Sequence, residues 1–337
     1  MLLFMKGHLQ FGLRLLLQVY YFLRPAIPQG LRFTLRHLYA APLKNAVFAT
    51  WPIHPNSKGV PADWPGWPDG KRFAFALSHD VEGIIGLQRC RKLAELEMKL
   101  GFRSSFNFVP KGEYNTPPDL RRFLTENGFE VGIHDLHHDG SLYRSRRSFS
   151  DSAVKINEYL KEWNAVGFRS GFMRHDLDWI GDLNIRYDAS TFDHDPFEPQ
   201  PDGVHTIFPF WVRREDGTAF LELPYTLAQD STLFLVLREK GTEVWKRKLD
   251  WIAEHGGMAF VIVHPDYTAF DETQSSKEYN VALYQELLEY VSDRYQDSAW
   301  FARPRDIERY LRKALPMPGH GSAADDIHYT QKLNTAV

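Results

Sequence analysis

Cysteine is almost absent from this 337-residue sequence, which contains only Cys90. An intrachain disulfide is therefore excluded, and a reducing compartment is favoured over an oxidising one. Cys90 lies in a stretch with helical periodicity. A plain helix position is a better interpretation of this residue than a catalytic nucleophile.

An excess of charge is also absent, because 40 Lys and Arg stand against 43 Asp and Glu, for a formal net charge of −3. No basic stripe with interleaved aromatic residues occurs, so a nucleic-acid partner is not expected. Hydrophobic residues make up 43% of the chain, which allows a sizeable globular core. The nine Trp are expected mainly in that core, with stacking against sugar rings as the alternative role.

Long hydrophobic runs are missing as well. The two apolar runs near the N-terminus, 1–4 and 11–23, are each shorter than the ~20 residues that span a bilayer. Arg24 and Pro25 follow in place of the small-residue cleavage site of a signal peptide. The leucine spacing predicts an amphipathic helix that either packs on the domain or lies on a membrane surface. We therefore expect a cytoplasmic protein, with peripheral membrane contact through residues 1–40 as the open alternative.

Three segments are expected to lie outside the main domain. Residues 1–45 form the helical extension, and residues 46–70 are rich in Pro and Trp. Proline at that density excludes a helix or a central strand, so 46–70 is predicted to be a loop that buries its Trp side chains against the domain. Residues 315–337 lack periodicity and are predicted to be a flexible tail. The main domain is expected at 71–314.

Within 71–314, apolar runs typical of β-strands alternate with helical stretches. Strands are expected at 73–77, 105–109, 129–133, 166–169, 220–223 and 258–263, and helices include 84–100, 120–127, 149–163 and 243–255. Repeated strand-then-helix order predicts an α/β fold with parallel strands and crossover helices. A barrel-like closure and an open, doubly wound sheet both satisfy this pattern.

Four of the apolar runs end in residues with chemical function. These ends carry Asp80 and Glu82, His134 and His138, Arg169, and His264. The carboxyl ends of the strands share one face in barrels and in open α/β sheets, and that face carries the site. We therefore expect these side chains to converge, and this is the strongest functional signal in the sequence.

His134 and His138 are four residues apart. If the chain turns helically after the strand, this spacing stacks both imidazoles on one side. Two imidazoles and one carboxylate form a usual catalytic zinc set that leaves a coordination position for water. The alternatives are a pair of surface histidines, or His137 as the partner of His134.

Asp80 and Glu82 alternate along an extended segment, so both can face one pocket while Val81 points into the core. One carboxylate can then bind an ion while the other acts as a base; solvated loop carboxylates are the alternative. Arg169 is placed to pair with a carboxylate and hold its pKa down, or to form a structural ion pair. His264 can protonate a leaving amine, or can be a buried histidine bonded to backbone.

Over residues 71–313 the order of these strand ends resembles the polysaccharide deacetylases with a NodB-type homology domain. The resemblance implies a distorted (β/α) barrel of about seven parallel strands, here with an N-terminal helical extension. It implies the following roles: Asp80 as catalytic base, His264 as acid, Arg169 as the partner of the base, and Glu82, His134 and His138 as metal ligands. The implied activity is hydrolysis of an N-acetyl group on a carbohydrate, with Zn2+, or else Co2+, Mn2+ or Ni2+, as the divalent ion.

The sequence departs from that family pattern in its first and fourth motifs. The first motif usually has two aspartates, whereas Glu82 is the second acid here. His79 stands where an aromatic residue is frequent, so it competes with Glu82 as the third ligand. The fourth motif, normally an acid and a tryptophan, has two candidate positions, 187–190 and 193–195.

Two other functions remain open alongside deacetylation of a glycan. One is hydrolysis of a small non-sugar amide on the same scaffold, as in allantoinase-like relatives. Trp179, Trp211 and Trp245, if they surround the active face, favour a carbohydrate. The other is a catalytically silent carbohydrate-binding homologue, which the presence of Glu82 in place of aspartate supports.

Overall fold

The computed structural model describes residues 29–47, 50–198, 202–214, 216–271, 275 and 277–317. Residues 1–28 of the predicted helical extension therefore lie outside the described residues. Residues 318–337 of the predicted tail lie outside them as well. Within the described ranges, no helix combines the length and the hydropathy needed to cross a membrane.

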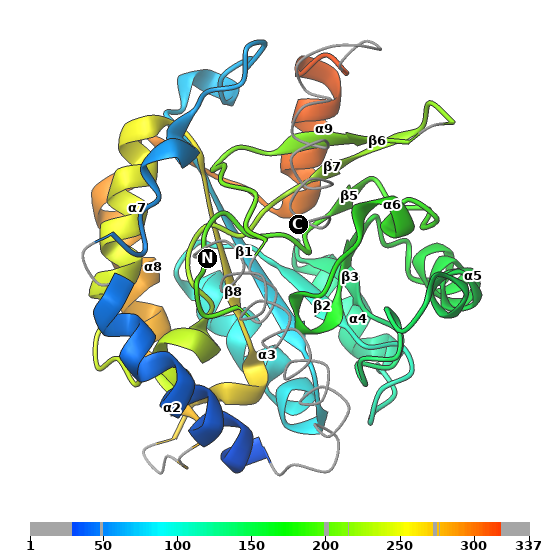
Figure 1. Cartoon of the computed structure of the whole chain (residues 1–337), viewed down its shortest axis with the longest axis horizontal. Helices are drawn as coiled ribbons and strands as arrows, with labels where there is room; N and C mark the ends of the chain where they lie inside the picture. The colour runs from blue at the N-terminus through cyan, green and yellow to red at the C-terminus, as the bar shows by residue number, and fades with distance from the viewer. Residues whose placement is uncertain are drawn as a thin grey trace, which may run out of the picture.

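A curled, mostly parallel sheet forms the centre of the molecule (Figure 1). Its strands are β1 (Phe73–Val81), β2 (Ser105–Phe108), β3 (Glu130–His134), β4 (Gly167–Arg169), β5 (Tyr187–Asp188), β6 (Phe210–Arg213), β7 (Ala219–Glu222), β8 (Met258–Val263) and β11 (Ala299–Phe301). The order is β11-β1-β2-β3-β4-β5-β7-β6, with β8 also paired to β1. β6 runs antiparallel to β7, and the other pairs are parallel. The predicted distorted (β/α) barrel is confirmed.

The barrel closes without a regular strand pair beside β8. There, the backbone N–H groups of Thr226 and Leu227 donate to the carbonyl of Phe260, at 3.0 and 3.1 Å. All nine residues of β1 are buried, as are all six of β8. Such continuous burial is expected of parallel strands with both faces covered.

Helices cover the outside of the sheet. They are α3 (Ile84–Lys99), α4 (Pro118–Glu126), α5 (Arg146–Trp163), α6 (Leu177–Ile180), α7 (Glu243–His255), α8 (Ala282–Tyr295) and α9 (Pro304–Ala314). Short helical turns are η2 (Pro55–Lys58), η3 (Pro68–Gly70), η4 (Gly171–Met173), η5 (Ser231–Val236) and η6 (Pro265–Tyr267), and a small two-stranded sheet joins β9 (Thr268–Ala269) to β10 (Tyr279–Asn280). Four helices were predicted within two or three residues of their observed ends.

The helix α2 (Gln29–Val47) precedes the barrel and packs along one end of it (Figure 1). The Nδ1 atom of His37 lies 2.7 Å from the carbonyl oxygen of Val236 in η5. The ring of Phe33 meets that of Tyr267 in η6 edge-on, with centroids 5.5 Å apart. These contacts hold α2 against the two turns that follow the late strands of the barrel.

The Pro- and Trp-rich segment packs as the sequence indicates. Trp51 and Trp67 are buried, and the Trp67 Nε1 atom donates to the carbonyl of Gly256 at 2.7 Å. Trp64 meets Trp67 edge-on with centroids 4.9 Å apart. The indole rings therefore bury against the barrel.

Candidate active site

The carboxyl ends of the strands open into one cavity of about 360 Å³. Its lining includes Asp80, Glu82, His134, His138 and His264. These residues come from β1, β3 and β8 and from the segments that follow them. The structure therefore brings together five of the six residues that the sequence indicates, and it buries the sixth, Arg169, beside Asp80.

Asp80 is held by two neighbouring strands. Parallel register places Asn107 of β2 opposite Asp80, and the Asn107 amide donates to Asp80 Oδ1 at 3.0 Å. The Arg169 Nε atom lies 3.3 Å from the same oxygen. Burial alone would raise the pKa of Asp80, but the charge of Arg169 leads the groups that lower it below its usual value. The Asp80 carboxylate is therefore kept ionised although it is almost completely buried.

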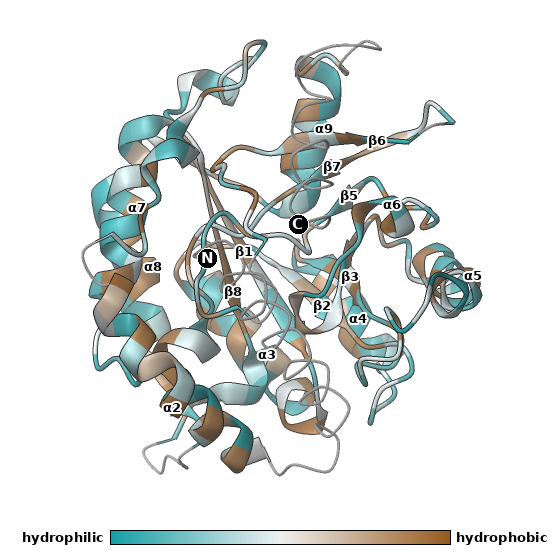
Figure 2. Ribbon diagram, in the orientation of Figure 1, coloured by the Kyte–Doolittle hydropathy of each residue, from teal (hydrophilic) through white to brown (hydrophobic). Residues whose placement is uncertain are grey.

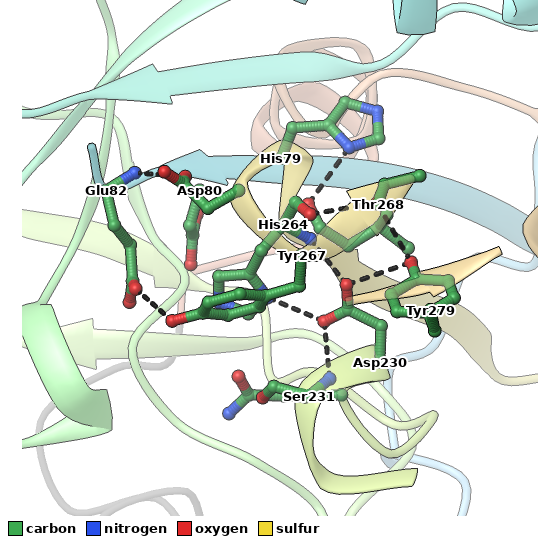
Figure 3. Close-up of polar contacts among 12 residues, drawn as sticks. His79, Asp80, Glu82, Asp230, Ser231, His264, Tyr267, Thr268 and Tyr279 are labelled. Carbon is green, nitrogen blue, oxygen red and sulfur yellow. Dashed lines mark hydrogen bonds and ion pairs between the residues drawn. The ribbon is translucent and has the colours of Figure 1, made fainter. Parts of the chain in front are cut away.

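His79 does not compete for the metal site, because alternation along β1 sends it to the opposite face from Asp80 (Figure 3). Its Nε2 atom lies 2.5 Å from Glu97 Oε1, and its Nδ1 atom lies 3.1 Å from the carbonyl oxygen of Val263. Both ring nitrogens are thus occupied inside the core. The proposal that His79 could replace Glu82 as a ligand is wrong.

Glu82, His134 and His138 form a cluster in which one potential ligand atom from each lies within 4.8 Å of the others. The His138 Nε2 atom lies 3.2 Å from Glu82 Oε1, and the two imidazole centroids are 4.7 Å apart. The helical turn on which the spacing argument depends is not found. Instead, Asp135 and His138 adopt positive φ angles of 60° and 54° in an irregular loop. The loop, and not a helix, turns His138 back toward His134.

The histidine nitrogens fit a divalent ion. The Nε2 atoms of His134 and His138 are both buried. That of His134 has no hydrogen-bond partner among the described residues, whereas that of His138 faces the Glu82 carboxylate at 3.2 Å. Such atoms are costly to bury unless another group satisfies them. His134 Nδ1 donates to the carbonyl of Arg169 at 3.2 Å, which leaves Nε2 as the lone-pair nitrogen. Burial lowers the pKa of His134 to about 4, so the ring is neutral at pH 7, as a metal ligand must be.

Residues after β8 support Glu82. The Tyr267 hydroxyl donates to Glu82 Oε2 (Figure 3). The Asp266 carboxylate accepts the backbone N–H groups of Glu82, Gly83 and Gly86 at 2.8–3.1 Å. The segment that leaves β1 is therefore tied to η6, which fixes the direction of the Glu82 side chain.

His264 is paired with an acid that sequence reasoning missed. Its Nδ1 atom donates to Asp230 Oδ1 at 2.6 Å, and its backbone N–H donates to Asp230 Oδ2 at 2.8 Å. Burial alone would lower the pKa of His264, but the charge and hydrogen bond of Asp230 raise it to about 10. The imidazole is therefore protonated at pH 7, and His264 lines the cavity.

Neither of the two candidate positions for the fourth motif supplies the acid that contacts His264, which is Asp230. Asp188 bonds to Ser190 at 2.7 Å and lies in the sheet beside Glu222. Asp193 forms a buried ion pair with Lys248 at 2.5 Å. Asp230 opens η5 in a stretch without strand periodicity, so its only signal was an acid just before an apolar run.

The three tryptophans expected around the active face do not line the cavity. Trp245 is fully buried and packs edge-on against Phe234. Trp211 donates to the carbonyl of Leu315 at 3.3 Å, and Trp179 packs against Phe149. These three indoles therefore cannot stack against a sugar in this cavity, and the prediction that they favour a carbohydrate substrate is wrong.

Solved structures of similar architecture include two polysaccharide deacetylases. The putative enzyme from Mycobacterium smegmatis superposes with a TM-score of 0.58 at 18% identity, over 76% of this chain and 96% of that one. The probable enzyme from Pseudomonas aeruginosa PAO1 gives 0.59 at 17%, over 80% of this chain and 100% of that one. The chain has the polysaccharide-deacetylase fold.

This deacetylase fold is also shared with the allantoinase Puue, at a TM-score of 0.60 and 17% identity, over 80% of this chain and 99% of that one. No family model matches the sequence, and none of the curated proteins matches it either. At these identities the likeness concerns the fold, so the chemistry must be argued from the cavity itself.

Proposed function

We propose that this protein is a metal-dependent hydrolase that removes an N-acetyl group from a carbohydrate and releases acetate. The observation that carries the proposal is the composition of one cavity. It holds the buried imidazoles of His134 and His138 beside Glu82, Asp80 in contact with Arg169 and His264 bonded to Asp230. A metal set, a base and an acid are the groups that amide hydrolysis requires.

Glu82, His134 and His138 would hold the ion, with Zn2+ proposed first because of the nitrogen-rich donor set. When bound, a divalent ion supplies Lewis-acid polarisation of the acetyl carbonyl and lowers the pKa of water from ~16 toward ~7. Asp80 takes the proton from the attacking water. Arg169 keeps Asp80 ionised and oriented through the contact of 3.3 Å.

His264 acts at the other end of the reaction. Its proton is retained at pH 7 because Asp230 holds it, and it is donated to the nitrogen of the departing amine. Once His264 has lost its proton, the Asp230 hydrogen bond keeps the ring in place for reprotonation. The products are acetate and a free amino sugar.

An acetylated carbohydrate is proposed as the substrate because two of the structural neighbours are described as polysaccharide deacetylases. A small non-sugar amide is the second candidate, and the similar score of the allantoinase favours it. The silent, binding-only alternative is less consistent with the cavity, because Asp80 and His264 both retain the charged partners, Arg169 and Asp230, that their proposed catalytic roles require.

The experiment that tests the proposal compares wild type with Asp80→Asn. Asparagine keeps an oxygen for the Asn107 amide but cannot take a proton, so we expect acetate release to fall by roughly a hundredfold or more while metal content is unchanged. Acetate release is measured on N-acetylated glycans and small amides, with and without chelator. Asp182→Asn, which breaks a surface ion pair with Arg146, is the control. Near-normal turnover in Asp80→Asn would overturn the proposal.

We also propose a cytoplasmic location with contact between α2 and a membrane surface. Leu31, Leu35, Leu38 and Tyr39 follow helical spacing, and each is between 42% and 65% exposed. Figure 2 shows hydrophobic colouring along this helix. The preceding residues, 1–28, are rich in leucine and carry Arg14 and Arg24, which suits an anionic lipid surface.

A further inference from the structure

Two arginines of α2 line the catalytic cavity. Arg32 and Arg36 line the same cavity as Glu82 and Tyr267. They are four residues apart, so their side chains leave the same side of the helix one turn from each other. α2 thus adds two positive charges to a cavity whose metal-binding and catalytic groups come from the barrel.

Neither guanidinium has a hydrogen bond or an ion pair within the part of the chain that the structure describes. The Arg32 Nε atom is buried and without a partner there. Two other cations at the site are paired instead: Arg169, buried beside the cavity, contacts Asp80, and His264, in the cavity lining, contacts Asp230. A partly buried guanidinium with unused donors is costly unless a ligand or water satisfies it.

The helix that carries the arginines is fixed relative to the reacting groups. Phe33, between them in sequence, packs edge-on against Tyr267, and Tyr267 donates to Glu82. On the next turn, His37 is bonded to Val236 at 2.7 Å. The arginines are therefore presented to the same cavity as the metal set, and not to a separate surface.

The carboxylates of the cavity do not use these two guanidiniums. Glu198 Oε1 accepts the Tyr225 hydroxyl at 2.9 Å and the Gln229 amide at 2.6 Å. Arg36 acts on Glu198 only through space, without an ion pair. Asp266 is taken by three backbone N–H groups. The free donors of Arg32 and Arg36 are therefore available to a ligand.

We propose that Arg32 and Arg36 form an anion-binding subsite, and that the substrate is an N-acetylated sugar that carries a carboxylate or a phosphate group. The planar guanidinium matches both anions with two parallel N–H donors. This inference rests on the proposed function for the acetyl group, and it adds the charge of the sugar. A neutral glycan would offer neither arginine an anionic partner.

Calorimetric binding to the full-length, metal-loaded chain tests the subsite directly. The probes are N-acetylglucosamine, its 1-phosphate, its 6-phosphate and its uronic acid. We expect at least one charged probe to bind at least tenfold more tightly than the neutral sugar in 50 mM salt, with a smaller difference in high salt. The preferred probe distinguishes phosphate from carboxylate. Equal affinities across the set would overturn the inference.

The variants Arg32→Gln and Arg36→Gln identify the residues responsible. Each is expected to reduce the preference for the charged probe by about tenfold, and Arg32→Lys is expected to restore part of it. Lys44→Gln is the matched control, because it removes a positive charge from α2 that pairs with Glu239 outside the cavity. Arg32 has no link to buried Glu198, so its variant remains decisive even if Arg36→Gln unfolds. An unchanged preference in Arg32→Gln would refute the assignment.

Acetate release separates the two proposals. If no probe and no glycan releases acetate in wild type, hydrolysis is wrong, while calorimetry still decides the subsite. If neutral and charged acetylated sugars are hydrolysed with equal kcat/KM and the arginine variants do not differ, hydrolysis stands and the subsite is wrong. Faster hydrolysis of a charged sugar, lost in Arg32→Gln, supports both.

Discussion

At the scale of single residues, the proton on His264 depends on one neighbour. Asp230 accepts the Nδ1–H group at 2.6 Å, and the Tyr279 hydroxyl and the His264 backbone N–H hold the same carboxylate in place. Burial opposes a charged imidazole, yet the pKa rises to about 10. Because the pKa of His264 in the folded protein lies above its usual value of 6.5, this pair stabilises the fold fully below pH 6.5 and loses that contribution as pH rises toward 10.

Asp230→Asn should therefore move the alkaline limb of activity. Without the negative charge, His264 loses its proton at a lower pH, and we expect the high-pH limb of kcat/KM to shift down by about one unit or more. The low-pH limb should stay in place, since Arg169 still holds Asp80 ionised. The measurement is a pH profile of acetate release, with thermal unfolding as a check on folding. An alkaline limb that does not move would show that His264 is not the acid.

Gly171 has no side chain, and this leaves space for the loop that carries His138. A Cβ atom built there would lie 2.6 Å from Asp135 Oδ2 and 2.9 Å from His138 Cδ2. Gly171→Ala should therefore displace His138 and weaken metal affinity by roughly ten- to a hundredfold, the range seen when groups that support metal ligands are changed. A competition titration against a chelating dye measures the affinity. Gly241→Ala, where a Cβ atom meets nothing within 4 Å, is the control and should match wild type; equal affinity in Gly171→Ala would contradict the expectation.

The residues at strand ends could be predicted from sequence because one physical rule governs them. Asp80, His134 and His264 each lie at or directly after the carboxyl end of a buried strand. The carboxyl ends of parallel strands lie on one face of the sheet. Asp230 could not be found this way. Its contact with His264 joins positions 34 residues apart, and no local periodicity encodes which acid meets which imidazole.

At the scale of elements, one side of α2 packs against the barrel and another side is exposed. One packs Phe33 and His37 against the late turns of the barrel. The other exposes Leu31, Leu35 and Leu38, at 50%, 42% and 65%. This exposed apolar side is the surface that we propose for contact with lipid.

Replacing Leu35 and Leu38 with glutamate should weaken binding to anionic vesicles by roughly tenfold or more, because buried apolar area is lost and like charges are introduced. Co-sedimentation with vesicles of phosphatidylcholine and phosphatidylglycerol measures the bound fraction. Val154→Glu, on the exposed side of α5 at 59%, is the control for surface charge. If wild type does not bind these vesicles, or the double variant binds as well, α2 does not contact lipid.

The boundaries of helices and strands could be predicted from the sequence where the hydrophobic pattern is unambiguous. β8 and α7 were predicted at their observed limits, because an unbroken apolar run and a strong helical period leave little choice. The segment after β3 does not form the helical turn considered for it. Its two positive φ angles, at Asp135 and His138, are stabilised by tertiary contacts that no local preference reveals.

At the scale of the whole molecule, sheet closure was the feature that sequence could not decide. Open and closed sheets share the same alternation of strands and helices. The outcome depends on the hydrogen bonds of Thr226 and Leu227 to Phe260, across more than thirty residues of chain. Closure also brings β8 beside β1, and this places His264 on the same cavity as Asp80.

Metal binding should couple these distant parts into one more stable unit. Glu82 follows β1, whereas His134 ends β3 and His138 lies in the loop beyond it, so an ion held by all three cross-links segments far apart in sequence. An ion at a thousand times its Kd stabilises the folded state by about 4 kcal/mol. Removal by chelator should therefore lower Tm by several degrees.

Glu82→Ala should abolish this difference, because a carboxylate ligand is lost and the Tm with and without Zn2+ becomes the same. Glu113→Gln is the matched control, since Glu113 lines the cavity without belonging to the ligand cluster, and it should keep the full increment. Metal content by mass spectrometry accompanies each melting curve. A wild-type Tm that changes with neither chelator nor Zn2+, together with no bound divalent ion, would favour a silent binding protein.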